Sequence, residues 1–169
     1  MKTRCARIKD AGAIHQLVAR YAEKGLLLPR AEVEIRRNIS HFLVLEEKRQ
    51  IVGGLSLESY GTDLAEIRSV AISPERRGEG LGANLVEFAL LEARRRGIAR
   101  VFAVTHAPQF FEQQGFVAAS RHSLTEKIER DCRTCPKQRS CKLVAVVATV
   151  IAERVMFPVL GETSPVPAC

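Results

Sequence analysis

The sequence predicts an α/β fold, with one domain built around a single mixed sheet. The chain has 169 residues, close to the usual size of one compact domain. Its predicted elements run strand, helix, helix, then a group of strands, then helix, strand, helix, strand. Hydrophobic residues make up 46% and charged residues 27%, as is ordinary for globular proteins, so a mainly disordered or collagen-like chain is excluded.

The start of the chain is expected to hold one strand and two helices. The strand is predicted at residues 5–8. A helix then lies between Asp10, a suitable capping residue, and Gly25, which favours a helix end. Its apolar residues recur at helical spacing: Ile14, Leu17, Val18 and Tyr21. A second, shorter helix is predicted at residues 31–38.

An antiparallel group of strands comes next. Three apolar runs of strand length are separated by polar stretches: residues 42–45, 51–59 and 64–72. Residues 47–50 are typical of a hairpin turn, and Pro74 stops the third strand because proline cannot continue the ladder.

A long helix and a second set of strands complete the domain. The helix starts after a glycine-rich turn, ends at Gly97 and has one apolar face: Leu85, Val86, Ala89, Leu90 and Ala93. A strand, a short helix and another strand are expected at residues 101–104, at residues 109–113 and from Phe116. We place the domain at residues 1–157, with a basic excursion on the sheet edge, a final strand and a flexible tail: residues 121–142, 143–151 and 158–169.

The chain is basic, with 26 Lys and Arg against 19 Asp and Glu, which favours anionic ligands. Aromatic residues are only 5% and tryptophan is absent, so base-stacking platforms for nucleic acid are not expected. The longest apolar run, residues 143–152, is half of the roughly 20 residues that a membrane helix needs. The start of the sequence has no apolar signal core, so we expect a cytoplasmic protein. From the aromatic content and the short apolar run, we expect no nucleic-acid or membrane partner.

The turn Arg77-Gly78-Glu79-Gly80-Leu81-Gly82 follows a strand and begins a helix. Glycine allows positive φ and a close approach of an anion to the main chain. Free N–H groups at the helix N-terminus then bind a phosphate, although a mere turn is the competing interpretation. A P-loop is excluded because the turn has no Gly-Lys-Ser/Thr ending. A Rossmann unit is also disfavoured, because its glycine turn follows the first strand, whereas this turn follows a later one.

A second motif follows at Phe110-Phe111-Glu112-Gln113-Gln114-Gly115-Phe116. Together the two motifs resemble the GCN5-related N-acetyltransferase (GNAT) superfamily, whose acetyl-CoA motif Arg/Gln-x-x-Gly-x-Gly/Ala is matched by Arg77, Gly80 and Gly82. The resemblance covers residues 3–120. It implies the GNAT fold, a twisted mixed sheet with splayed parallel strands and flanking helices.

Within that superfamily the chain resembles the acetyltransferase domain of N-acetylglutamate synthases. Four segments carry this resemblance: residues 27–30, 63–72, 101–105 and 123–127. The kinase-like amino-acid domain of the longer synthases is absent, so the chain is similar to the short, single-domain version.

The resemblance implies acetyl-CoA as co-substrate, lying where two parallel strands separate. Backbone groups of Val70, Ala71 and Ile72 would pair with the pantetheine arm. The amides of one turn would hold the pyrophosphate: Gly78, Glu79, Gly80, Leu81, Gly82 and Ala83. Arg77 adds charge or is simply solvated, and Phe111 packs beneath the cofactor.

The implied reaction is direct attack of an unprotonated amine on the thioester. The amide of Val70 would polarise the carbonyl. Glu66 is the candidate base, acting directly or through water, with a salt bridge to Arg68 as the competing interpretation. Phe111 stands where many members carry a tyrosine as general acid, so that role is vacant or has moved. The candidates are water, Ser69, Thr105 and a residue in the 120s.

An acidic amino-acid acceptor requires cationic contacts, preferably a bidentate arginine. The candidates for substrate binding are Arg30, Arg68 and Lys127. By the two-residue period of a strand, Glu66, Arg68 and Val70 are expected to share a face, which would place Arg68 beside the reaction cleft.

Three cysteines form a cluster that is unusual in this fold: Cys132, Cys135 and Cys141. A CxxC pair grips zinc or iron and the third thiol could join, which predicts a structural metal site. The fourth ligand would be His122, Cys5, Cys169 or a group from another subunit. Redox-active or unpaired thiols are the alternative, and an odd number of cysteines favours reduced thiols over a disulfide framework.

We therefore expect an acetyl-CoA-dependent N-acetyltransferase acting on the α-amine of glutamate or a related amino acid. The same chemistry on another small amine, or on a protein N-terminus or lysine, is the second interpretation. A third is a catalytically weak GNAT module that binds acyl-CoA and contacts a partner through residues 121–142. Phe111 favours the third interpretation, whereas Glu66 and the glycine turn favour the first two. A homodimer is left open.

Overall fold

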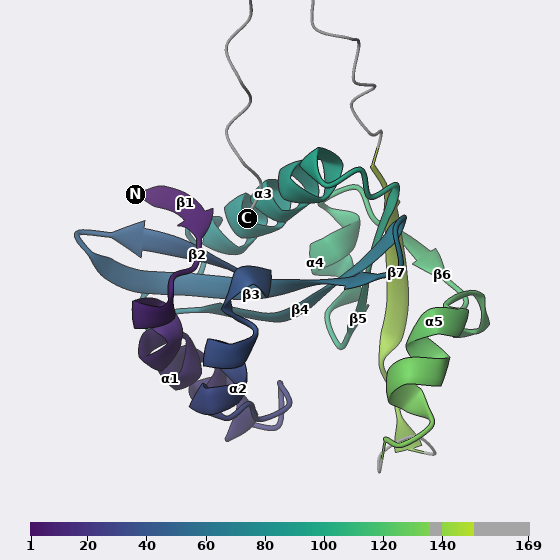
Figure 1. Ribbon diagram of the computed structural model, residues 1–169, viewed down its shortest axis with the longest axis horizontal. Helices are drawn as coiled ribbons and strands as arrows, with labels where there is room; N and C mark the ends of the chain where they lie inside the picture. Colours follow the sequence, from purple (N-terminus) through teal and green to yellow (C-terminus); the bar gives the residue numbers. More distant parts are fainter. Residues whose placement is uncertain (136–139, 151–169) are drawn as a thin grey trace, which may run out of the picture.

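The computed structural model describes residues 1–135 and 140–150. Its centre is one seven-stranded sheet with the order β1-β2-β3-β4-β5-β7-β6 (Figure 1). The strands are β1 (Lys2–Cys5), β2 (Phe42–Glu47), β3 (Gln50–Tyr60), β4 (Leu64–Ile72), β5 (Arg100–Thr105), β6 (Val117–Ala119) and β7 (Val144–Thr149). Only β4 and β5 pair in parallel, so the predicted α/β class with a mixed sheet is confirmed.

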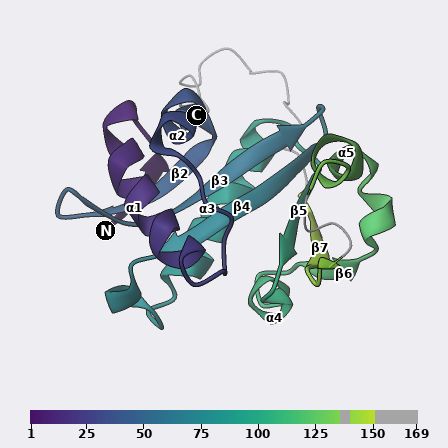
Figure 2. The same cartoon turned by 90° about the horizontal axis from the view of Figure 1, so that it is seen from below.

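Helices cover both faces of the sheet. They are α1 (Ala11–Ala22), α2 (Glu32–Arg37), α3 (Leu81–Arg95), α4 (Pro108–Glu112) and α5 (Thr125–Lys127). The first two lie on one face and α3 on the other, as Figures 1 and 2 show from perpendicular directions. Two buried clusters follow this division, because one contains the apolar face of α3 and the other contains those of α1 and α2. No helix within these described ranges is long and apolar enough to cross a membrane.

The first strand lies earlier than predicted, at Lys2–Cys5 instead of residues 5–8. The Asp10 carboxylate accepts a hydrogen bond of 2.7 Å from the amide of Arg7. This bond closes a 3₁₀ turn at Ile8–Asp10, which ends the extended backbone before Ile8. The apolar Ile8 is 60% exposed, so its hydrophobicity did not mark a buried strand position.

An ion pair between Arg4 and Asp10 ties β1 to the start of α1. The nitrogen and oxygen lie 2.7 Å apart, with side chains 12% and 6% exposed. Burial alone would raise the pKa of Asp10, but hydrogen bonds from Arg4 and the Arg7 amide outweigh it and lower the pKa. Ionised Asp10 therefore stabilises the fold above the usual carboxyl pKa, and this stabilisation is lost as the pH falls through the lowered value.

We expect Asp10→Asn to lower the free energy of unfolding at neutral pH by about 1.5–3 kcal/mol, the range for hydrogen bonds to charged groups. Urea denaturation at neutral and acid pH measures this loss, which should shrink on acidification. The control is Asp63→Asn, because the Asp63–Arg100 pair spans 3.3 Å between side chains that are about half exposed, and its loss should be below about 1 kcal/mol. Equal losses in both variants would contradict the prediction.

A bulge in β4 reverses the direction of its side chains. Arg68 pairs with Ser56 and Ala71 pairs with Gly54, so two residues of β4 lie opposite one residue of β3. One of the two, Ser69, has φ of +53°, which is uncommon for a residue other than glycine.

The bulge overturns the prediction that residues 66, 68 and 70 share a face. Before it, Ala65 and Ile67 belong to the cluster beneath α3, and after it Val70 packs there. Glu66 and Arg68 therefore face away from α3, whereas Val70 faces towards it.

The two parallel strands stay together for only three residue pairs. Leu64, Ala65 and Glu66 of β4 face Arg100, Val101 and Phe102 of β5. In the described part of the chain no further pairs join these strands, although β5 continues beside β7 as far as Thr105. Figure 2 shows β4 and β5 diverging from this point. The splayed arrangement that the resemblance implied is therefore present.

The first part of the predicted edge excursion, residues 121–132, is helical. Helical turns at Arg121–Ser123, α5 and Ile128–Cys132 follow β6, the last of these a π-helical turn. Leu124 is buried with Tyr60 and Phe102 in a third cluster on the face opposite to α3. The predicted tail, residues 158–169, and the end of the predicted domain at residue 157 lie outside the described residues.

Candidate active site

The glycine turn presents bare backbone at the start of α3. Gly78 and Gly80 have φ of +82° and +75°, and a Cβ atom added at either would meet no atom within 4 Å. No side chain caps α3, so its first amides remain available to an anion. Gly82 also serves packing, because a Cβ there would lie 3.2 Å from the ring of Phe110.

Arg77 lies beside this turn and is held by α1. Its guanidinium lies 4.9 Å from the centre of the Tyr21 ring, and its Nε donates a hydrogen bond of 3.1 Å to the Tyr21 hydroxyl. That hydroxyl donates in turn to the carbonyl of Ile72, at 2.6 Å. The arginine is exposed but orientated, with its charge next to the open amides.

Phe111 is a core residue. It is 4% exposed and belongs to the cluster beneath α3. Its ring meets those of Phe110 and Phe116 edge to face, with centroids 5.1 Å and 5.2 Å apart. These contacts agree with the packing role expected for this position, and a phenyl ring has no proton to donate.

The polar residues that the sequence singled out come together on the face opposite to α3. Glu66 and Arg68 extend from β4, Lys127 from α5, and Arg30 from the segment before α2. Lys127 Nζ lies 2.9 Å from Glu66 Oε2, and Arg68 Nε contacts the same oxygen. Arg30 and Arg68 share Glu58, with nitrogen–oxygen distances of 3.3 Å and 3.1 Å. The three predicted cations thus belong to one ion-pair network.

Glu66 stands where the parallel strands separate. It is the last residue of β4 paired with β5, and its side chain is 4% exposed. The hydroxyl of Tyr60 donates to it at 2.8 Å. Among the described residues, every hydrogen bond and ion pair of Glu66 uses Oε2, which leaves Oε1 to receive a proton. The predicted salt bridge with Arg68 is present, and the geometry keeps a second oxygen for base chemistry.

Five members of the network were not found from the sequence: Glu34, Glu58, Tyr60, Arg130 and Asp131. One signal was available, because Glu58 lies directly opposite Glu66 on neighbouring strands. Like charges facing each other across a sheet are destabilising unless cations lie between them. Had the register been known, this pairing would have marked a cationic site.

Tyr60 contacts the network through both its ring and its hydroxyl. The Arg130 guanidinium carbon lies 3.6 Å from the centre of its ring, and the Phe102 ring packs against it. Burial raises the pKa of Tyr60, and the negative charge of Glu66 raises it further. The hydroxyl therefore stays protonated and acts as a hydrogen-bond donor.

Two hydroxyls proposed as proton donors lie on the two diverging strands. Ser69 Oγ accepts a hydrogen bond of 3.1 Å from Arg30 Nε, and Thr105 Oγ1 accepts one of 3.0 Å from the amide of Ala107. Both groups use a lone pair in these contacts and keep their proton.

The cysteine cluster does not have the geometry of a metal site. Within residues 1–135 and 140–150, no three His, Cys, Asp or Glu side chains are placed to hold a metal ion. Cys132, Cys135 and Cys141 are free thiols. Burial alone would lower the pKa of Arg121, but the nearby sulfurs of Cys132 and Cys141 raise it. A fixed cation among the thiols opposes a second one, which argues against the predicted metal site.

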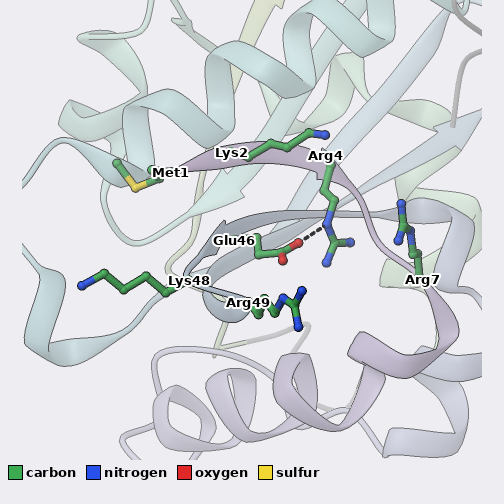
Figure 3. Close-up of a pocket in the computed structure, with 7 residues that line it drawn as sticks. All are labelled: Met1, Lys2, Arg4, Arg7, Glu46, Lys48 and Arg49. Atoms are coloured by element: carbon green, nitrogen blue, oxygen red, sulfur yellow. Dashed lines mark hydrogen bonds and ion pairs between the residues drawn. The ribbon is translucent and has the colours of Figure 1, made fainter.

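A basic hollow of about 400 Å³ lies at the other end of the sheet, beside β1 and the turn between β2 and β3 (Figure 3). Its lining is Met1, Lys2, Arg4, Arg7, Glu46, Lys48 and Arg49. Arg4 is bound to Glu46 at 2.5 Å, and the other cations surround this pair. None of the predicted site residues lines this hollow, so it is separate from the network around Glu66.

The chain is similar to known acetyltransferases. The family model described as an acetyltransferase (GNAT) domain matches residues 38–118. An uncharacterized N-acetyltransferase of Chlorobaculum tepidum is 37% identical over 147 residues, which cover 87% of this chain and 95% of that protein. An amino-acid acetyltransferase of Mycobacterium tuberculosis is 35% identical over 135 residues, which cover 78% of this chain and 77% of that protein.

Two solved structures have a similar fold. The N-acetylglutamate synthase of Neisseria gonorrhoeae, complexed with coenzyme A and N-acetyl-glutamate, matches with a TM-score of 0.81 and 28% identity. That match covers 89% of this chain and 35% of the synthase chain. A Mycobacterium tuberculosis protein in complex with CoA matches with a TM-score of 0.77 and 28% identity. That match covers 89% of this chain and 100% of the other.

Proposed function

The chain belongs to the GNAT family of acetyl-CoA-dependent N-acetyltransferases, and we propose that its acceptor is the α-amine of glutamate or a related amino acid. The observation that carries this proposal is the convergence of Arg68 and Lys127 on Glu66, where β4 and β5 separate, with Arg30 joined to them through Glu58. A cationic site beside a buried carboxylate suits a substrate that has acidic groups and an ammonium. The similarity to amino-acid acetyltransferases supports the same acceptor class.

The two substrates approach from opposite faces of the sheet in this proposal. The amides of residues 78–83 and the guanidinium of Arg77 hold the pyrophosphate of acetyl-CoA at the start of α3. Backbone groups of Val70, Ala71 and Ile72 take the pantetheine arm along the strand edge that β5 leaves unpaired. The amide of Val70 donates to the thioester oxygen and polarises the carbonyl.

Proton transfer is assigned to the opposite face. Glu66 Oε1 takes a proton from the acceptor's ammonium, directly or through one water, and the free amine attacks the thioester carbon. As the C–S bond breaks, the nitrogen loses its second proton to water, and the departing sulfur takes a proton from water, either directly or through Ser69 or Thr105. Arg30, Arg68 and Lys127 hold the acceptor's carboxylates. A cytoplasmic location and a homodimer stay predictions.

We expect Arg68→Met to raise the KM for glutamate by about 10–100-fold, since a charge-assisted hydrogen bond is worth roughly 1.5–3 kcal/mol. The KM for acetyl-CoA should hardly change, because Arg68 faces away from α3. Arg68→Lys should recover only part of the loss, since an ammonium lacks the planar fork. Steady-state kinetics with glutamate measures these values.

Arg100→Met is the control for the lost charge, because Arg100 is exposed and paired only with Asp63 among the described residues. If both Arg68 variants acetylate glutamate normally, the carboxylates are held elsewhere.

The direct test of the proposed function is thiol release from acetyl-CoA with a panel of amino acids, small amines and peptides. Glutamate or a close relative should give the fastest release. Faster release with a peptide or a non-acidic amine would overturn the acceptor assignment and leave only the family. No release above the rate of hydrolysis with any amine would favour the acyl-CoA-binding module.

A further inference from the structure

Every cation assigned to the acceptor's carboxylates is already paired within the protein. Arg30 binds Glu34 and Glu58, Arg68 binds Glu58, Glu66 and Asp131, and Lys127 binds Glu66 and Asp131. With Arg130, which binds Glu58 and Asp131, the network holds four cations and four carboxylates. Its formal charge is therefore zero, and a dicarboxylate that enters it finds no free cation.

One of these carboxylates makes the contacts that a substrate carboxylate would make. Asp131 Oδ2 accepts a hydrogen bond of 2.8 Å from Lys127 Nζ, and it also contacts Arg68 Nη2 and the hydroxyl of Tyr60. Burial alone would raise the pKa of Asp131, but its bonds with Lys127, Tyr60 and Arg68 lower it. Lys127 and Arg68 are two cationic donors to this one oxygen, and the single proton of the Tyr60 hydroxyl is shared between Asp131 and Glu66, so these groups form an anion subsite.

Among the carboxylates that contact Arg68 or Lys127, Asp131 is the one that can leave most easily. Its side chain is 28% exposed, whereas that of Glu66 is 4% exposed. Glu58 and Glu66 are fixed in paired strands, but Asp131 belongs to the π-helical turn Ile128–Cys132, which contains no buried residue. Such turns are rare and occur often at functional sites. Moving this turn would open the subsite without breaking the core.

We propose that Asp131 is an internal stand-in for the acceptor's carboxylate, filling the subsite of Arg68, Lys127 and Tyr60 until an acidic acceptor displaces it. This inference rests on the proposed function. Release of Asp131 leaves the network with one positive charge, which an amino dicarboxylate with net charge −1 neutralises. An acceptor without an acidic side chain lacks that driving force, so Asp131 lowers affinity for all acceptors and selects for acidic ones.

The test uses glutarate, a dicarboxylate without an amine, so that binding is measured without turnover. In calorimetry with coenzyme A present, Asp131→Asn should bind glutarate about tenfold more tightly than the wild type, which corresponds to one lost competing contact. The KM for glutamate should fall by a similar factor. Glu129→Gln is the matched control, because it removes the same charge from the same turn at an exposed position and should change nothing.

Unchanged or weaker glutarate binding by Asp131→Asn would overturn the inference, since it would make Asp131 a support for the cations. A second measurement needs no variant. Saturating glutarate should speed amide exchange in residues 128–132 of the wild type, because the turn is displaced, and slowed or unchanged exchange would also overturn it. Failure of the proposed function is separate, because it would appear as a wild type that does not acetylate glutamate.

Discussion

Replacing Glu66 by Gln is expected to lower turnover by about 10²–10⁴-fold, the usual contribution of a positioned acid–base group. The amide keeps the size of the side chain and its hydrogen bonds with Tyr60, but its oxygen cannot take a proton from an ammonium. Affinity for acetyl-CoA should stay the same, because Glu66 faces away from α3. The loss should shrink as the pH rises, since more of the acceptor is then free amine. Thiol release as a function of pH measures both effects.

Glu58→Gln is the control, because it removes the same charge from the same network on the neighbouring strand. It should disturb the ion pairs without removing the base. If the two variants lose turnover equally and show the same pH dependence, the role of Glu66 is the salt bridge alone.

Gly80→Glu should weaken acetyl-CoA binding by at least about tenfold, or 1.4 kcal/mol. The new carboxylate would lie at the open amides of α3, where it competes with the pyrophosphate for the same positive helix end. Titration calorimetry measures the change. Any side chain at φ of +75° also strains the backbone. The control is therefore a variant that has the same backbone strain but lies away from the turn.

Gly61→Glu provides this control. Gly61 has the same φ of +75°, and a Cβ atom there would likewise meet nothing within 4 Å. Both variants should lose similar stability in thermal unfolding, while only Gly80→Glu should lose affinity for acetyl-CoA. Normal acetyl-CoA binding by Gly80→Glu would show that this turn does not hold the pyrophosphate.

Local patterns predicted most of the fold. The strand Leu64–Ile72 has the predicted bounds, because its apolar run ends at a proline. The bulge at Ser69 was missed, although the alternation of polar and apolar residues breaks at Arg68-Ser69, because this break defines a bulge only once β4 is paired with β3. That single extra residue is why Val70 and Glu66 lie on opposite faces of the sheet.

The site was predicted only in part, because local patterns identify candidate residues but do not show which distant segments meet. Arg30, Arg68 and Lys127 were identified as charges that an acidic acceptor would need, and they do meet. Asp131 is spaced for a local pair with Lys127, but its place in the site was missed because its contacts with Tyr60 and Arg68 join segments more than sixty residues apart. The cysteine spacing suggested a metal, but spacing alone could not show Arg121 between the thiols.

The short parallel junction between β4 and β5 has a consequence for cooperativity. Three residue pairs are all that link β1–β4 to β5, β7 and β6 through parallel pairing in the described chain, so the sheet is two hydrogen-bonded halves held together mainly by a shared apolar core. Each half can then open with its own free energy, as separate cooperative units do. A pantetheine arm bonded along β4 would bridge the halves and make them open together. Acetyl-CoA would thus set how much of the protein unfolds as one unit, beyond the stability that its binding adds.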